Sequence, residues 1–238
     1  MQPRRIHTIV VGASAGGIEA LRELVGAFPE DFPGVVLVVL HVAPVATSVL
    51  PQILARAGAL EAKHAEDGAE AHGGCIYVAP PDRHLLVTDG RLHLDVGPRV
   101  NGHRPAIDPL FRSAADAYGD CAAGVVLSGV LDDGTAGLMA IKRAGGMTFV
   151  QDPAEAKYQA MPQNAIDLVQ PDRVATAHEL GLALAEAVRE PPPPDGRQAA
   201  QPPTHVSEAR LVEVDRGGTD SPQPGGAVRR QHQEKSAA

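Results

Sequence analysis

A serine in a glycine-rich turn is the first residue of this sequence that could do chemistry. Ser14 lies in the segment Gly-Ala-Ser-Ala-Gly at 12–16, which fits the G-x-S-x-G pattern of nucleophilic serines. In that pattern the glycines permit a sharp turn from a strand into a helix, and the turn lifts the serine hydroxyl above the sheet. A serine that only caps the helix gives the same pattern, so the turn alone leaves both interpretations open.

A histidine and a pair of aspartates stand at two further strand ends. His41 follows the apolar run Val35–Leu40. If that strand pairs with the one before Ser14, a spacing of about 5 Å lets the two side chains meet above the sheet. The loop after another apolar run carries Asp132 and Asp133, one of which could fix the imidazole tautomer while the other caps a helix. These residues predict a Ser-His-Asp site.

Two backbone N–H groups are candidates for stabilising a developing oxyanion. One belongs to Ala15, at the start of the helix after the serine, and the other to Val130, on the loop that carries the aspartates. We therefore predict an oxyanion hole built from Ala15 and Val130, in which the loss of one donor typically costs about 100- to 1000-fold in rate.

A dinucleotide-binding fold is the alternative from another functional class. It would need G-x-G-x-x-G and an acidic residue roughly 20 residues further on. Here Ser14 replaces the second glycine, so that its side chain would crowd a pyrophosphate, and the second strand ends in His41. Both departures weigh against a nucleotide cofactor, and a non-catalytic interaction module ranks equally low.

Strands and helices alternate along residues 1–189. The β-branched or apolar runs at 6–11, 35–40, 123–128 and 147–150 read as buried strands, and helical spacing follows the first of them. Asp89-Gly90 predicts a hairpin within 85–96, and Asp108-Pro109 predicts a helix whose cap is Asp108 and which ends at Tyr118. Thr176 to Glu179 predicts a capping box for the last helix. This order predicts a doubly wound α/β fold, with a mostly parallel sheet flanked by helices and one antiparallel hairpin.

Composition narrows the functional class further. The 238 residues carry a net charge of −8, which argues against a nucleic-acid partner or an anionic membrane surface. Only two cysteines are present, which argues against a disulfide framework and a structural zinc site and fits a reducing compartment. No apolar run approaches the roughly 20 residues of a membrane span. We expect a cytoplasmic protein without membrane insertion. Residues 190–238 hold eight prolines and no aromatic residue, so we predict a disordered tail after a folded domain at 1–189.

Five ordered segments of the sequence resemble the catalytic domain of the bacterial chemotaxis methylesterases (CheB type). The resemblance covers about residues 5–189, and five motifs in order make it specific. The segments are GASAGG at 12–17, HVAP at 41–44, YVAP at 77–80, HRPAID at 103–108 and SGVLDDG at 128–134.

That resemblance implies an activity, a partner and a role for each site residue. The family hydrolyses glutamyl methyl esters on the cytoplasmic helices of methyl-accepting chemoreceptors, releasing methanol, and some members deamidate receptor glutamines. By this similarity Ser14 is the nucleophile, His41 the general base and then acid, and Asp133 the orienting carboxylate, because the family's aspartate directly precedes the glycine. The resemblance implies no cofactor and no metal; a small-ester hydrolase or a protein-glutamine deamidase with the same triad is the alternative.

Departures from the family pattern raise separate expectations. Family members commonly begin with a receiver domain, whereas here the catalytic domain is expected to start at about residue 5, so we expect regulation either to be lost, which would leave a constitutively active domain, or to be supplied by a separate activating protein. Val42 and Val130 stand where methionine is common. The sequence gives no role for the signature at 103–108: Arg104 could pair with an acidic receptor helix or with Asp108, and we favour the structural pairing with Asp108.

The remaining candidate side chains predict structure rather than chemistry. Ser128 also follows a buried strand, but no second base lies near it in the sequence. We expect no catalytic part for four further histidines, which are His64, His72, His84 and His93.

Overall fold

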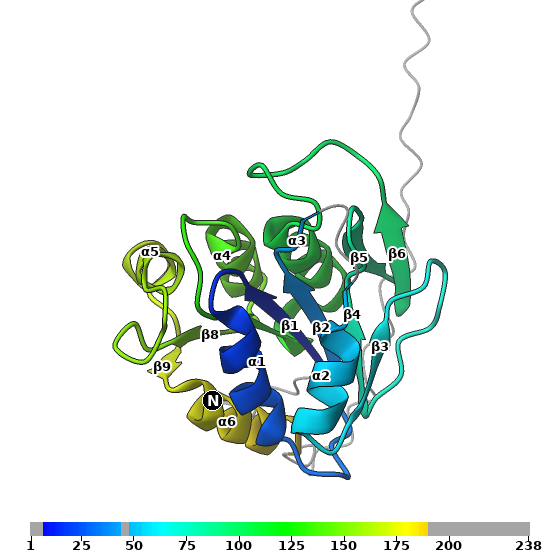
Figure 1. Ribbon diagram of the computed structural model, residues 1–238, viewed down its shortest axis with the longest axis horizontal. Helices are drawn as coiled ribbons and strands as arrows, with labels where there is room; N and C mark the ends of the chain where they lie inside the picture. Colours follow the sequence, from blue (N-terminus) through cyan, green and yellow to red (C-terminus); the bar gives the residue numbers. More distant parts are fainter. Residues whose placement is uncertain (1–6, 44–47, 190–238) are drawn as a thin grey trace, which may run out of the picture. The chain divides into compact units, whose positions relative to one another are not determined.

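A seven-stranded parallel sheet forms the centre of the computed structural model, which describes residues 7–43 and 48–189. Its strand order is β3-β4-β2-β1-β7-β8-β9, and every neighbouring pair is parallel (Figure 1). The strands are β1 (Thr8–Ala13), β2 (Val35–Leu40), β3 (Glu61–His64), β4 (Cys75–Val78), β7 (Ala122–Val126), β8 (Met147–Gln151) and β9 (Arg173–Ala175).

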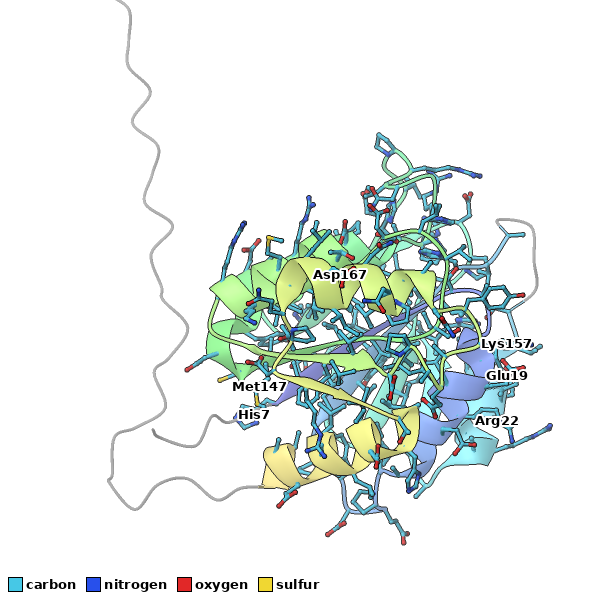
Figure 2. All side chains as sticks on the ribbon, turned by 90° about the vertical axis from the view of Figure 1, so that its left-hand side faces the viewer. His7, Glu19, Arg22, Met147, Lys157 and Asp167 are labelled. Atoms are coloured by element: carbon cyan, nitrogen blue, oxygen red, sulfur yellow. The ribbon has the colours of Figure 1, made fainter. Side chains whose placement is uncertain are left out.

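Helices cover both faces of this sheet. One face carries α1 (Gly17–Gly26), α2 (Leu50–Ala57) and α6 (Ala177–Arg189), and the other carries α3 (Ile107–Tyr118), α4 (Thr135–Arg143) and α5 (Ala160–Val169) (Figure 1). Figure 2 shows the two layers on either side of the strands, with Asp167 marking α5. The predicted doubly wound α/β fold is confirmed.

The apolar runs are strands because both of their faces are buried. Ile9 and Val11 pack into the core beneath α1, α2 and α6, whereas Val10, between them, packs into the core beneath α3, α4 and α5. A strand covered on both sides needs apolar residues at every position, and β-branched side chains fit its pleated surface. The sheet is therefore packed on both faces, and the loops described below leave it at its carboxyl edge.

The predicted hairpin is a separate two-stranded antiparallel sheet. It consists of β5 (His84–Thr88) and β6 (Arg91–Asp95), joined by Asp89 and Gly90 with φ of 51° and 75°. Two positive φ values in a two-residue loop are what a type I′ turn requires, and Asp-Gly supplies them at low cost. The hairpin packs its apolar residues into the same core as α3.

Helix caps followed the predictions in one case and not in another. The capping box at the start of α6 is confirmed, because Thr176 N–H donates to Glu179 and Glu179 N–H donates to the Thr176 hydroxyl. The cap predicted at Asp108 is wrong, since α3 begins one residue earlier, at Ile107, after an extended Ala106. The carboxylate of Asp108 is used at a different helix.

The described part of the chain contains no helix long and apolar enough to cross a bilayer. The tail predicted for 190–238 lies outside the described residues.

Candidate active site

Three loops meet at the carboxyl edge of the sheet. Ser14 directly follows β1 and His41 directly follows β2, and the two strands are in register, with Ala13 opposite Leu40. His41 N–H continues this ladder by donating to the Ala13 carbonyl over 3.1 Å. The loop that carries Asp133 follows β7, on the other side of β1. Parallel pairing therefore brings three strand ends to one place.

The turn at Ser14 is held by its backbone. Ser14 N–H donates to the Ser128 carbonyl over 2.9 Å, and Gly16 has a φ of 71°, which an L side chain rarely adopts. The residue that caps α1 is Gly16, without any side-chain cap bond. The interpretation of Ser14 as a helix cap is therefore wrong, and its hydroxyl is left for another partner.

Close packing around this turn depends on another glycine. A Cβ atom at Gly129 would lie 2.9 Å from Ser14 Cβ and 2.7 Å from Met161 Sδ. Only a glycine lets the loop after β7 approach the serine so closely. On its other side the turn meets the loop after β8, because a Cβ at Gly16 would lie 2.8 Å from Lys157 Cβ.

His41 links the serine to the aspartate. Its Nδ1 is 3.1 Å from Ser14 Oγ, and its Nε2 is 2.7 Å from Asp133 Oδ2. An ionised carboxylate only accepts hydrogen bonds, so Nε2 carries the proton and Nδ1 is left as the acceptor for the serine hydroxyl. The side chains of His41 and Asp133 are 7% and 2% exposed, which removes most competing water from the pair.

Four donors surround the carboxylate of Asp133. Besides His41, Ile107 N–H donates to Oδ2 over 2.8 Å, and Oδ1 accepts from Asn101 Nδ2 over 2.8 Å and from Asp108 N–H. Burial raises the pKa of Asp133, but the hydrogen bonds, led by the one from His41, outweigh it and hold the pKa below its usual value. Asp133 is thus fixed as an anion at the start of α3.

Two glycines let α3 reach that carboxylate. A Cβ at Gly12, in β1, would lie 2.3 Å from Ile107 Cγ2, and a Cβ at Gly134 would lie 2.7 Å from the same atom. Gly134 also has a φ of 94°. The first glycine of the serine turn pattern therefore has a second role, because it makes room for the helix start that binds Asp133.

The carboxylate of Asp108 accepts hydrogen bonds from N–H groups at the start of α4, as that of Asp133 does at the start of α3. Its Oδ1 accepts from Gly134 N–H over 3.1 Å and from Gly137 N–H over 2.7 Å, in the first turn of α4. Burial raises the pKa of Asp108, and the nearby charge of Asp133 adds to the effect. Asp133, which precedes α4, accepts from N–H groups at the start of α3, and Asp108, in α3, accepts from N–H groups at the start of α4. For this reason the prediction that Asp108 caps its own helix was wrong.

The partner predicted for Arg104 is wrong, although its structural role is right. Its guanidinium donates twice to Asp82 Oδ1, over 3.0 and 2.7 Å, and also to the carbonyls of Val96 and Gly97. Asp108 is occupied by helix N–H groups, so Arg104 instead fastens the segment after the hairpin to the loop before it.

Sequence reasoning missed two residues beside the triad. Asn101 Nδ2 bridges the two aspartates, with 2.8 Å to Asp133 and 3.0 Å to Asp108. The His103 ring stacks on His41, with ring centroids 3.7 Å apart and an angle of 7° between the planes. The signal that could have found them is Asn101-Gly102, a two-residue turn with φ of 51° and 80°.

The two predicted oxyanion donors lie on either side of the serine, and their role stays a prediction. Neither Ala15 N–H nor Val130 N–H donates to any described residue. The Gly129 carbonyl accepts from Met161 N–H over 3.0 Å. Because the peptide bond is planar and trans, Val130 N–H points the opposite way, away from Met161.

The side chains predicted to be structural have backbone partners. Ser128 is fully buried, and its hydroxyl donates to the Ala15 carbonyl over 2.8 Å. His84, also buried, bonds the Pro98 carbonyl and Ala106 N–H with its two ring nitrogens. Across residues 7–43 and 48–189, no group of three or more His, Cys, Asp or Glu side chains is placed to hold a metal ion.

A parallel α/β sheet with a hydrogen-bonded serine, histidine and aspartate at its carboxyl edge is the arrangement of a serine-hydrolase type of site. The family model described as "CheB methylesterase" matches residues 9–184, and the chain belongs to this family. The crystal structure of the Thermotoga maritima CheB methylesterase catalytic domain superposes with a TM-score of 0.72 at 32% identity, covering 76% of this chain and 98% of that one. The resemblance found in the sequence is confirmed.

Similar curated proteins carry a double name. Protein-glutamate methylesterase/protein-glutamine glutaminase 2 of Anaeromyxobacter dehalogenans (strain 2CP-C) is 39% identical over 185 residues, which cover 78% of this chain and 54% of that protein. A relative from Leptospira interrogans named for the same two activities is 38% identical over 175 residues, with coverage of 73% and 91%. The chain spans about half the length of the Anaeromyxobacter relatives that it matches.

Proposed function

We propose that this protein hydrolyses glutamyl γ-methyl esters on the cytoplasmic helices of chemoreceptors and releases methanol. The observation that carries the proposal is the continuous hydrogen-bonded chain from Ser14 through His41 to Asp133. Membership of the CheB methylesterase family and the names of its relatives support the class of substrate. Chemoreceptor signalling helices are cytoplasmic, so the proposal includes that location.

The first half of the reaction forms an acyl-enzyme. His41 Nδ1 takes the proton from the Ser14 hydroxyl as Oγ attacks the ester carbonyl carbon. The carbonyl oxygen becomes an oxyanion, and the new imidazolium is stabilised by Asp133 on its other nitrogen. When the tetrahedral centre collapses, the bond to the methoxy group breaks and His41 gives its proton to that oxygen, which leaves as methanol.

The second half repeats these steps with water. His41 removes a proton from a water molecule that attacks the acyl carbon, and the collapse of the second tetrahedral centre breaks the bond to Ser14 Oγ. The proton returns to that oxygen, and the substrate leaves with a free glutamate side chain. In both halves we assign Ala15 and Val130 N–H as the oxyanion donors, which fits their position on the two loops nearest the serine.

Exposed apolar side chains around the serine suit a macromolecular substrate. Ile18, Val130, Leu131 and Tyr158 are all at least 40% exposed and belong to the loops and the helix turn that adjoin Ser14. Large exposed apolar groups gathered at one place commonly mark an interaction site. Leu131 also has a φ of 65°, and its carbonyl is held by Asn164. The rim around Ser14 is therefore built to contact more than one ester group.

Methanol release tests the proposal. Wild type, Ser14→Ala and the control Ser113→Ala are incubated with a methylated chemoreceptor fragment, and methanol is measured over time. Ser113 lies in α3, where its hydroxyl contacts backbone groups of α3 and the hairpin. We expect release by wild type and by the control only. Full activity of the Ser14 variant would contradict the assignment of the nucleophile.

Deamidation of glutamine is the second candidate, because the names of the relatives pair it with the esterase. The same residues would act, with ammonia leaving in place of methanol. Receptor fragments that carry glutamine at the modified sites distinguish the two, since ammonia release without methanol release from the ester form would favour the deamidase.

A further inference from the structure

A second histidine covers one face of His41. The rings of His41 and His103 are 3.7 Å apart at their centroids and only 7° from parallel. Both edges of the His41 ring are already engaged, one by Ser14 and the other by Asp133. His103 is therefore placed to restrict the remaining motion of His41, which is rotation of the ring about the Cβ–Cγ bond.

The backbone on both sides of His103 is anchored. His103 N–H donates to the Val100 carbonyl over 2.9 Å, and Val100 N–H donates back over 3.1 Å, which closes the turn at Asn101-Gly102. The next residue, Arg104, is fastened by Asp82 and two backbone carbonyls. These bonds fix the backbone from which the His103 ring reaches over His41, and the backbone need not move when His41 changes charge.

Charge makes this contact useful during the reaction. His41 becomes an imidazolium when it takes the proton of Ser14, and the π face of a neutral ring attracts a cation. Burial lowers the pKa of His103, as do the neighbouring His41 and, on its own segment, Arg99, while Asp133 acts in the opposite direction. His103 is consequently neutral at pH 7, so it presents such a face to His41.

We propose that His103 is a positioning residue, whose neutral ring holds His41 in line between Ser14 and Asp133 and stabilises its protonated form. The inference rests on the proposed function, since it needs His41 to act as the base. It also gives a role to the first residue of the segment at 103–108, for which the sequence offered none.

The test measures how reactive Ser14 is, without a receptor. A fluorophosphonate phosphonylates an activated serine: Oγ attacks phosphorus, fluoride leaves and His41 takes the hydroxyl proton. Second-order labelling rates of the full chain are compared for wild type, His103→Ala and His103→Phe, with His93→Ala as the control. His93 lies on the hairpin, where its side chain is 45% exposed. Ser14→Ala shows whether the label is on that serine.

We expect His103→Ala to label about tenfold more slowly than wild type, as the loss of an aromatic face beside a cation implies. His103→Phe retains a flat ring and should label within about twofold of wild type, and His93→Ala should be unchanged. The labelling rate is also measured against pH, because the midpoint of its acid limb would not move if His103 had only a structural role. A flat ring over His41 stabilises the protonated form of His41, so the midpoint should be the same in wild type and His103→Phe. It should move to lower pH in His103→Ala, which lacks the ring.

Three results would overturn the inference. The first is a labelling rate of His103→Ala equal to that of wild type, and the second is a His103→Phe rate as slow as that of His103→Ala. The third is an acid-limb midpoint of His103→Phe that differs from wild type, and this result decides alone if His103→Ala does not fold. Absence of labelling in wild type would instead overturn the proposed function, and this inference with it.

Discussion

Two serines at the same edge of the sheet show how differently one side chain can be used. Ser14 follows β1 and Ser128 follows β7, the strand beside it. The Ser14 hydroxyl meets a histidine nitrogen, whereas the Ser128 hydroxyl donates to the Ala15 carbonyl and accepts from Tyr158 N–H over 3.0 Å. A position at a strand end does not make a serine a nucleophile.

The surroundings of the two serines explain the difference. Ser128 N–H donates to Gln151 Oε1, and Gln151 donates in turn to Glu155, whose carboxylate accepts from Ala177 N–H. That network consists of structural bonds and is closed by helix α6. The network of Ser14 instead runs to the imidazole of His41 and to the buried carboxylate of Asp133. The first network should therefore govern stability, and the second one activity.

Removing the Ser14 hydroxyl should have the largest effect on activity. We expect Ser14→Ala to lower kcat for methanol release by more than about 1000-fold, because in the described part of the chain Ser14 supplies the hydroxyl that meets His41 Nδ1. The midpoint of urea unfolding should stay close to the wild-type value, since Ser14 is half-buried and the substitution removes a single hydroxyl. Both quantities are measured on the same preparation, and a large drop in stability would place Ser14 in the structural network.

Replacing the anion of the triad should be nearly as severe. Asp133→Asn removes the charge that fixes the tautomer of His41, and we expect kcat to fall by roughly 1000-fold. Asp132→Asn is the matched control, since Asp132 is exposed and its side chain has no part in this network. Methanol release by the two variants decides between the neighbouring aspartates, and a larger loss in Asp132→Asn would reverse the assignment.

Removing the Ser128 hydroxyl should give the opposite pattern to Ser14. Ser128→Ala leaves the partly buried Ala15 carbonyl and Tyr158 N–H without this partner, and we expect a cost of about 1 kcal/mol in the free energy of unfolding. Activity should fall by much less than in Ser14→Ala, because His41 keeps its partners. Urea titration measures the first effect and methanol release the second. An unchanged unfolding midpoint would contradict the closed network.

Changing the apolar rim should act on binding alone. Leu131→Asn puts a polar side chain in the rim, at a φ that asparagine tolerates, and we expect a rise in KM of about tenfold with kcat little changed. Leu168→Asn is the control, because Leu168 in α5 is 62% exposed, close to the 63% of Leu131, and lies outside the rim. Equal KM values for the two variants would argue against the rim as a substrate contact.

The smallest effects should be those of pH on the free energy of unfolding, to which the two buried aspartates, Asp133 and Asp108, contribute with opposite sign. The pKa of Asp133 is lowered in the folded protein, so its stabilisation is present above about pH 4 and is lost as pH falls through the folded pKa. The pKa of Asp108 is raised, so its ionisation costs stability as pH rises through the folded pKa. Urea unfolding from pH 3 to 7 checks both. As the pH falls, the advantage in stability of wild type over Asp133→Asn should shrink. Over the same fall in pH, the stability of wild type relative to Asp108→Asn should rise.

Local patterns were enough to predict the fold and to place Ser14, His41 and the pair Asp132-Asp133 at its edge, whereas the choice of Asp133 came from the family resemblance. The apolar runs predict buried parallel strands because such strands are covered on both faces, and parallel strands bring their carboxyl ends to one edge. The glycine turn at Ser14 and the Asp89-Gly90 hairpin depend on φ values that neighbouring residues dictate. These features were predictable because their causes lie within a few residues of sequence.

The tertiary structure decided which partners those residues have. His41 and Asp133 are 92 positions apart, and nothing local says that Asp133 contacts the ring while Asp132 does not. Asp108 was expected to cap its own helix, but the close approach of α3 and α4 at Gly137 lets it cap the neighbouring one. The stacking of His103 on His41 likewise depends on two anchored segments. Periodicity places a residue on an element, but only packing between elements selects the atoms that it meets.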